Sequence, residues 1–260
     1  MGRIREIELP WTQQPQEAVR VAGDLARDLS LLVNFGAGAS NQLGGAPIAQ
    51  GAAQLGLSPL GRALLCPGGA QQSYGYAVSP SGATQPLSAL LAAHITAQGA
   101  LFSVAGSYYS EEPFLLLTSN ASNINLYAAG DYRVSAPSLI GLAIIGVRFD
   151  GAALELWING AMAGSAALGS LGSYNSSNLY IGGGYGNSAD AQYAACAYWR
   201  RDIGREAMRL LTTNPWAMFA PRRLVIPTTA AAPAVPDITF VGAENITSNS
   251  VGYRVTLNYA

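Results

Sequence analysis

The carboxylates of this chain do not form a pattern that could cleave a sugar bond. Hydrolysis of a glycosidic bond needs two carboxyl groups about 5 to 10 Å apart, one on each side of the bond. Glu155 lies in an alternating run, and the positions two and four residues away on either side are not acidic. Glu111 and Glu112 are adjacent, which would send them to opposite faces of a strand, and Pro113 after them indicates a loop. We therefore expect a protein that is not an enzyme.

A mechanism based on a nucleophile is not indicated either. His94 is the only histidine, and no Gly-x-Ser-x-Gly turn precedes a helix. A Ser-His-Asp triad therefore lacks its usual sequence signals. We expect His94 to lie in a loop or at the end of a strand.

Tyrosine and asparagine side chains in predicted loops are the better candidates for binding. Sugars stack on aromatic rings and form hydrogen bonds with amides, but exposed tyrosine is also a common contact residue at protein interfaces. Both a glycan and a protein partner therefore remain open. The candidate residues are Tyr108, Tyr109, Tyr132, Tyr174, Asn175, Tyr185 and Asn187.

Large aromatic residues outside the regular strands are candidates for assembly contacts. An Asn-Pro-Trp turn after a predicted helix would carry Trp216 and Phe219 onto a surface. The alternative is that these two rings cover the base of the domain. The remaining assembly candidates lie towards the two ends of the chain and are Trp11, Phe240, Tyr253 and Tyr259.

Two Asx-Gly turns organise the segment Leu142–Gly164. Asp150-Gly151 and Asn159-Gly160 supply the positive φ angles of tight hairpin turns, and alternating apolar runs surround them. The pattern predicts consecutive antiparallel strands with one buried face. The residues of that face are Ile145, Val147 and Phe149 before the first turn, and Leu154, Leu156 and Ile158 after it.

Turn signals at a spacing of about 8 to 12 residues predict an all-β sandwich. Leu87–His94 could be helical on its Leu and Ala content, but its neighbours favour a strand. Arg62–Ser79 predicts a strand pair around Pro67-Gly68-Gly69, and Asp202–Leu211 predicts one short helix that Asp202 can cap. The other predicted strands are Leu87–Thr96, Ala100–Gly106, Phe114–Ser119, Ile124–Ala128, Leu139–Phe149, Ala153–Asn159, Ala161–Ala166, Leu179–Gly182 and Gln192–Trp199.

The overall charge gives no sign of a nucleic-acid partner. The net charge is −1, all 14 basic residues are arginine, and nucleic-acid binding relies on clustered positive charge. The N-terminus has no apolar signal-peptide core, and no apolar run is long enough to cross a membrane. Cys66 and Cys196 are widely separated in sequence, so two buried free thiols are favoured over a disulfide. We expect a soluble protein made in a cytoplasm.

The order of strands and turns resembles the LamG, or concanavalin-like, jelly roll. Glu155–Gly160 matches the family's LELWING strand and turn, Leu179–Gly183 matches its LYIGG strand, and Arg200–Leu211 matches the closing segment. Gly204 occupies the position where the family usually has a Ser or Thr helix cap. The family places a Glu three residues after that cap, whereas Glu206 follows Gly204 by two residues. The resemblance implies a jelly-roll sandwich. We expect no cofactor; the alternative that the resemblance implies is a bound Ca²⁺, with Asp131 and Asp190 among its ligands.

A narrower resemblance concerns two short segments. NPWAMFAPRR at Asn214–Arg223 and PWTQQPQ at Pro10–Gln16 are similar to proteins of tailed phages and prophages. This resemblance implies a non-enzymatic virion protein of the capsid, tail or baseplate, which forms homo-oligomers and binds other virion proteins through its arms. The alternative is a carbohydrate-binding adhesion module for host surface polysaccharide.

These patterns divide the chain into four parts, with a jelly roll between two arms. The C-terminal arm is expected to form a hairpin, which is marginally stable alone and would dock on a neighbour. The parts are an N-terminal arm at 1–30, the jelly roll at 31–213, the NPW segment and Ala/Pro-rich linker at 214–236, and the C-terminal arm at 237–260.

Overall fold

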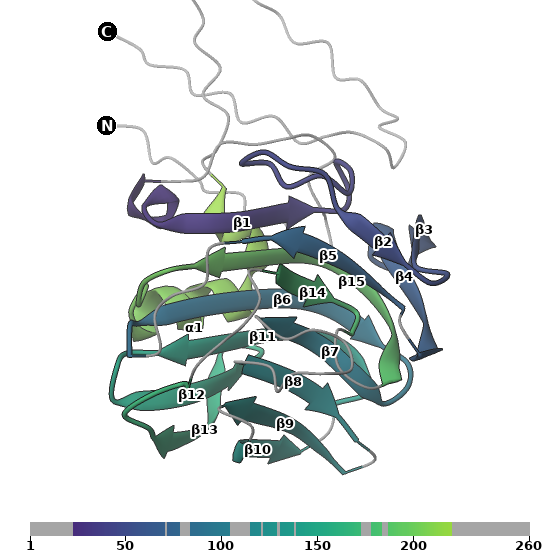
Figure 1. The fold of residues 1–260 in the computed structure, drawn as a ribbon. Helices are drawn as coiled ribbons and strands as arrows, with labels where there is room; N and C mark the ends of the chain where they lie inside the picture. Colours follow the sequence, from purple (N-terminus) through teal and green to yellow (C-terminus); the bar gives the residue numbers. More distant parts are fainter. Residues whose placement is uncertain are drawn as a thin grey trace, which may run out of the picture. The chain divides into compact units, whose positions relative to one another are not determined.

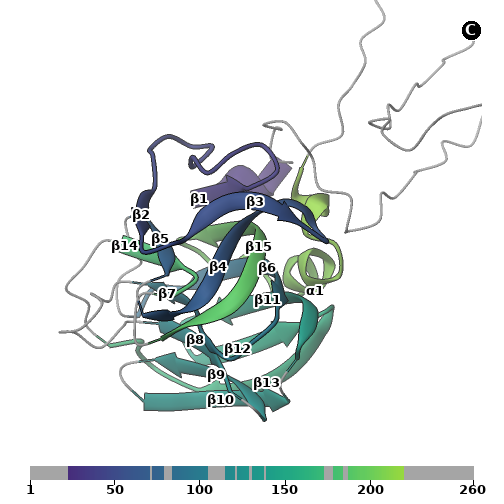
Figure 2. The same ribbon diagram turned by 90° about the vertical axis from the view of Figure 1, so that its right-hand side faces the viewer.

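The computed structural model describes nine stretches of the chain, all within one compact unit, Leu9–Ala220. Two β-sheets pack face to face, and a short helix covers the outside of one of them (Figures 1 and 2). The predicted all-β sandwich with one short helix near its C-terminal end is confirmed. The described residues are 23–70, 72–78, 84–104, 115–120, 122–128, 131–137, 139–172, 178–183 and 187–219, without the side chains of 115, 116 and 132.

The first layer, sheet A, is centred on a long strand that comes late in the sequence. Its order is β13-β12-β11-β6-β15, and the free edge of β15 pairs with β4 along its first half and with β1 along its second half. β3 pairs with β4, and every pairing is antiparallel. The strands are β1 (Leu29–Asn34), β3 (Gln54–Ser58), β4 (Gly61–Ala70), β6 (Leu87–Ile95), β11 (Gly141–Phe149), β12 (Ala153–Ile158), β13 (Ala161–Ala167) and β15 (Asn187–Trp199).

The second layer, sheet B, has the antiparallel order β2-β5-β14-β7-β8-β9-β10. A single parallel bridge, Ser188 to Ala100, links β15 of sheet A with β7 of sheet B in the described part of the chain. The strands are β2 (Ile48–Gln50), β5 (Ser73–Ala77), β7 (Gly99–Val104), β8 (Leu115–Ser119), β9 (Asn123–Ala128), β10 (Asp131–Pro137) and β14 (Asn178–Ile181).

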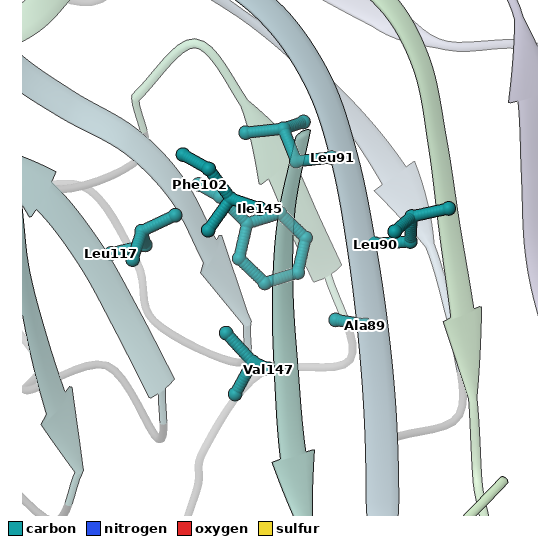
Figure 3. Close-up of a pocket in the computed structure, with 7 residues that line it drawn as sticks. All are labelled: Ala89, Leu90, Leu91, Phe102, Leu117, Ile145 and Val147. Atoms are coloured by element: carbon teal, nitrogen blue, oxygen red, sulfur yellow. The ribbon is translucent and has the colours of Figure 1, made fainter. Parts of the chain in front are cut away.

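The main core fills the space between the two sheets. The predicted inward face of β11 and β12 is confirmed, because all six of its apolar residues are at most 9% exposed and belong to this core. Both cysteines are buried here as free thiols, as predicted. A small space inside the core has seven apolar lining residues, so it offers a ligand no polar side chain (Figure 3). The lining residues are Ala89, Leu90, Leu91, Phe102, Leu117, Ile145 and Val147.

Both predicted Asx-Gly turns are present. Asn159 and Gly160 have φ angles of 49° and 86°, as a two-residue hairpin turn requires. In the other turn, Oδ1 of Asp150 accepts hydrogen bonds from the backbone N–H groups of Ala152 and Ala153. Local side-chain chemistry therefore fixes the register of three consecutive strands.

Helix α1 (Arg205–Thr213) packs against the outer face of sheet A (Figure 2). Glycine at position 146 of β11 permits this close approach, since a Cβ atom there would lie 2.7 Å from Cγ2 of Thr212. Gly204 is the N-cap residue and, being glycine, makes no side-chain capping hydrogen bond, while its own N–H donates to Oδ1 of Asp202 over 2.7 Å. The helix begins three residues later than predicted. Two short 3-10 helices, η1 (Gly23–Ala26) and η2 (Pro215–Met218), flank the sandwich in sequence.

The prediction for residues 62–79 was wrong. β4 runs unbroken through Pro67-Gly68-Gly69 and pairs with β3 and β15, whereas β5 pairs with β2 and β14. β3 accompanies β4 only as far as Leu65. Pro67 therefore stands at an edge, where a missing N–H is tolerated.

Several element boundaries also differ from those predicted. β1 begins at Leu29, inside the expected arm, and β15 begins five residues before the predicted Gln192. β10 occupies a segment that was expected to be a loop. The remaining predicted strands are present with ends shifted by at most two residues. The hairpin predicted for the C-terminal arm at 237–260 lies outside the described residues.

Candidate functional site

Most of the sequence-predicted contact residues lie outside the described residues. For binding these are Tyr108, Tyr109, Tyr174, Asn175 and Tyr185, and for assembly they are Trp11, Phe240, Tyr253 and Tyr259. Glu111 and Glu112 also lie outside them.

The two described binding candidates are not neighbours. Tyr132 is in β10, where its backbone pairs with Tyr127 of β9. Asn187 is an exposed residue at the start of β15, where it pairs with Ala70. The strands β9, β8 and β7 separate β10 from β15.

Trp216 and Phe219 are buried by the chain itself. They are 7% and 9% exposed, and their rings stack with centroids 6.1 Å apart. Oδ1 of Asn214 accepts a hydrogen bond from the N–H of Trp216, which caps η2. Of the two sequence interpretations, the structure supports the one in which these rings cover the domain. They join an apolar cluster on the outer face of sheet A that includes Leu32, Leu90, Ile144, Trp199, Leu211 and Met218.

The structure reveals a polar surface on the outer face of sheet B that the sequence analysis did not identify. Leu117, Leu126 and Val134 point into the core, so the alternate residues of β8, β9 and β10 face outwards. The strand register places Thr118 opposite Asn125, and Asn125 opposite Ser135. We call this surface the polar face, and its described side chains are Thr118, Asn123, Asn125, Tyr127 and Ser135. Arg133 is not counted in it, because it is the extra residue at the register shift between Tyr132 and Val134.

The polar face is ordered by hydrogen bonds between its own members. The Ser135 hydroxyl donates to Oδ1 of Asn125 over 3.2 Å. Asn125 is only 6% exposed, and the other four side chains are half-buried. Neighbouring strands are about 4.8 Å apart, so the three-strand row is about 10 Å wide. The face presents hydroxyl, amide and phenol groups, which can both donate and accept hydrogen bonds.

The adjacent strands of sheet B support this face and do not extend its open surface. The Tyr180 ring lies over Gly75, where a Cβ atom would lie 2.8 Å from the ring, and Tyr180 is 8% exposed. Nδ2 of Asn178 lies 3.3 Å from the Tyr180 hydroxyl. Ser103 is fully buried and donates to the carbonyl oxygen of Gly183. Half-buried Tyr127 is therefore the more accessible of these two tyrosines.

Glu155, the acid that drew attention in the sequence, is part of a buried ion cluster under α1. It is 0% exposed, and its Oε1 lies 2.9 Å from Nη1 of Arg148 and 2.6 Å from Nη2 of Arg205. Its Oε2 accepts a hydrogen bond from the Trp157 indole. Two hydrogen bonds of 2.6 Å join the Arg148 guanidinium to Asp202. The cluster fastens the start of α1 to sheet A.

The electrostatics of this cluster keep Glu155 charged. Burial raises the pKa of Glu155, but hydrogen bonds from Arg205, Arg148 and Trp157 outweigh it and hold that pKa below its usual range. The hydrogen bond to Asp202 raises the pKa of Arg148 further above its ordinary value. Glu155 is therefore an ionised structural carboxylate beyond the reach of a substrate.

The acids suggested for Ca²⁺ do not come together. Asp131 lies on β10 and pairs with Arg133 at 2.9 Å, while the backbone carbonyl of Asp190 on β15 accepts hydrogen bonds from Thr96 and Ala97. Within the described stretches, no group of three His, Cys, Asp or Glu residues could hold a metal ion. These two residues do not fit a shared Ca²⁺ site.

His94 lies near the end of β6, as predicted. It pairs with Gln192 of β15 and Leu142 of β11. No helix in the described part of the chain is long and apolar enough to cross a membrane.

Comparison with known proteins gives no match to a protein-family profile or to a curated protein. Solved structures do match. The receptor-binding domain of botulinum neurotoxin C/D mosaic serotype has a TM-score of 0.53 at 10% identity, over 71% of this chain and 51% of that one. The fold is a concanavalin A-like jelly roll. The chain spans about half the length of the neurotoxin binding domains that it matches.

Two other similar structures come from different kinds of protein. Domain 4 of AbnA, an arabinanase from Geobacillus stearothermophilus solved with arabinotriose, has a TM-score of 0.52 at 10% identity, and 71% of this chain covers 98% of it. Trypanosoma rangeli sialidase has a TM-score of 0.55 at 12% identity, over 74% of this chain and 33% of that one. None of these structural matches shows the link to phage proteins that the sequence resemblance suggested. At such low identities the likeness establishes the fold alone.

Proposed function

We propose that this jelly roll is a carbohydrate-binding module and that the polar face of sheet B contacts the oligosaccharide. The observation that carries the proposal is the row Thr118, Asn125 and Ser135 across three adjacent strands, with Tyr127 beside it. Such a row can satisfy several hydroxyl groups of one ligand, and the tyrosine supplies an aromatic surface. The function proposed is adhesion through recognition of a polysaccharide.

The structural neighbours support this proposal over a purely structural role. The AbnA domain was solved in complex with arabinotriose, and a botulinum neurotoxin DC binding domain was solved in complex with SialylT. For botulinum neurotoxin type C, another structural match, cell entry is dependent upon interaction with two ganglioside molecules. The same fold therefore binds sugars in proteins that share about a tenth of their residues with this chain.

A glycan array followed by calorimetry on the best ligand tests the proposal. Loss of one hydrogen bond of about 1 kcal/mol weakens binding about fivefold, so Ser135→Ala and Tyr127→Ala should each lower the affinity by that factor or more. The matched control is Gln54→Ala, at an exposed position of β3 in the other sheet. If both polar-face variants keep the full affinity, the polar face is not the binding site.

The same array can test the loop tyrosines predicted from the sequence. If the loops complete the site, Tyr109→Ala and Tyr185→Ala also weaken binding. If only these two variants lose affinity, the binding site lies in the loops and the polar face is excluded.

The virion location remains a separate proposal that rests on the sequence resemblance alone. The packing of η2 gives Asn214, Pro215 and Trp216 a structural reason to be present, so these residues need no assembly role. We retain the proposal that the module is carried on a phage particle and binds the host surface, with partners among the virion proteins. Detection of the protein in purified particles by mass spectrometry would test it.

A further inference from the structure

We infer that the polar face takes a neutral oligosaccharide and discriminates against acidic sugars such as sialic and uronic acids. This inference rests on the proposed carbohydrate-binding function and adds the class of ligand. It follows from the distribution of positive charge along the chain and from the contacts of one arginine.

Positive charge is almost absent from the strands of sheet B, where Arg133 is the one basic residue. The chain has no lysine, and between Ala63 and Trp199 its only arginines are Arg133 and Arg148. Arg148 is buried, 7% exposed, in the ion cluster under α1 on the outer side of sheet A. Among these residues, Arg133 alone could offer a positive charge to a ligand on sheet B.

Arg133 is already neutralised by its neighbours on β9 and β10. Its Nη2 lies 2.9 Å from Oδ2 of Asp131, and its Nε donates to the carbonyl oxygen of Ala128 over 3.3 Å. The Asp131 side chain is 71% exposed, so a ligand approaching this edge meets an acid as well as a base.

Among the described residues, a carboxylate on this surface would find no positive charge that is not already paired. Moving a carboxylate out of water is costly unless a cation or several hydrogen-bond donors replace the lost hydration. The described side chains of the polar face are uncharged and their hydroxyl groups also act as acceptors, so they suit sugar hydroxyls better than an anion. Ligands without charge avoid this penalty.

The test compares neutral and acidic oligosaccharides of the same length by calorimetry on the full chain. The expected result is neutral binding about tenfold or more tighter than acidic binding, with little change between low and high salt. Equal or tighter binding of the acidic ligands would overturn the inference while leaving the carbohydrate-binding function intact. Binding of neither class would overturn both.

Two variants sharpen the test because they lie beside the polar face and not within it. Asp131→Asn removes the acid that neutralises Arg133, so acidic ligands should gain affinity severalfold while neutral ligands stay within about twofold. Adding Arg133→Ala to that variant should abolish the gain. If Asp131→Asn produces no gain, Asp131 does not set the charge preference and the inference fails.

Discussion

Replacement of Glu155 by glutamine is the perturbation whose cost can be derived most directly from the structure. The change keeps the shape of the side chain but removes its charge. Arg148 would keep its two hydrogen bonds to Asp202, while Arg205, whose side chain is 61% exposed, would return to water. The Trp157 indole would keep an acceptor only if the new amide oxygen faces it.

The expected loss of stability is about 3 kcal/mol at pH 7. Removing one partner of a buried ion pair costs about 3 to 5 kcal/mol, and the lower end applies because Arg148 retains Asp202. The matched control is Glu206→Gln. Glu206 pairs with Arg209 on the exposed side of α1, where its side chain is 86% exposed, so its loss should cost at most about 0.5 kcal/mol.

The pH dependence gives an independent check. Because the folded-state pKa of Glu155 is lowered, its contribution to stability is fully present above the pKa of an unfolded glutamate, about 4.3. This contribution is lost as the pH falls through the folded-state pKa of Glu155. The stability gap between the wild-type protein and Glu155→Gln should therefore be largest near pH 7 and narrow below about pH 4.

Urea unfolding followed by tryptophan fluorescence and circular dichroism, at several pH values, measures both quantities. A loss below about 1 kcal/mol at pH 7 would contradict the burial argument. A gap that stays constant between pH 7 and pH 3 would show that the charge of Glu155 does not stabilise the fold.

Three further predictions concern packing and turns. Trp216→Ala should lower the unfolding free energy by about 3 to 5 kcal/mol, because it removes a buried ring, and should leave the mass measured by light scattering unchanged. A smaller mass with unchanged stability would instead indicate a subunit contact. Gly146→Val should lower the unfolding free energy by about 1 to 3 kcal/mol, because the new side chain meets α1. Gly169→Ala is the control, because a Cβ atom there has nothing within 4 Å, and its unfolding free energy should be within about 0.5 kcal/mol of wild type. Equal denaturation midpoints for the two variants would refute this contrast. Asn159→Ala should cost about 1 to 2 kcal/mol, since it loses both the turn preference and the hydrogen bond from Ile144 N–H, and an unchanged thermal midpoint would count against it.

The parts of the fold that local chemistry determines could be predicted from the sequence. The β11–β12–β13 meander follows from Asp150-Gly151 and Asn159-Gly160, whose turn types fix the strands on either side. The short helix could be predicted from its apolar spacing, but only part of the role of Asp202 could be. Its Oδ1 accepts a hydrogen bond from the N–H of Gly204 at the start of the helix, and the same carboxylate pairs with Arg148, 54 positions earlier in the chain.

The candidate site could not be predicted because it depends on register between strands. Asn125 and Ser135 are ten residues apart and meet only through the pairing of β9 with β10. A signal was nevertheless present. The run from Asn123 to Ala128 alternates polar and apolar residues, which is typical of a strand with one open face. Tyr132 was expected to lie in a loop, whereas it belongs to β10 and pairs with Tyr127 of β9.

The measurement that tests the proposed function most directly is an NMR titration of the isotope-labelled chain with its best neutral oligosaccharide. The account predicts that the largest shift changes fall on Thr118, Asn125, Tyr127 and Ser135 of the outer face of sheet B. Changes confined to sheet A and α1, or none at saturating ligand, would contradict it.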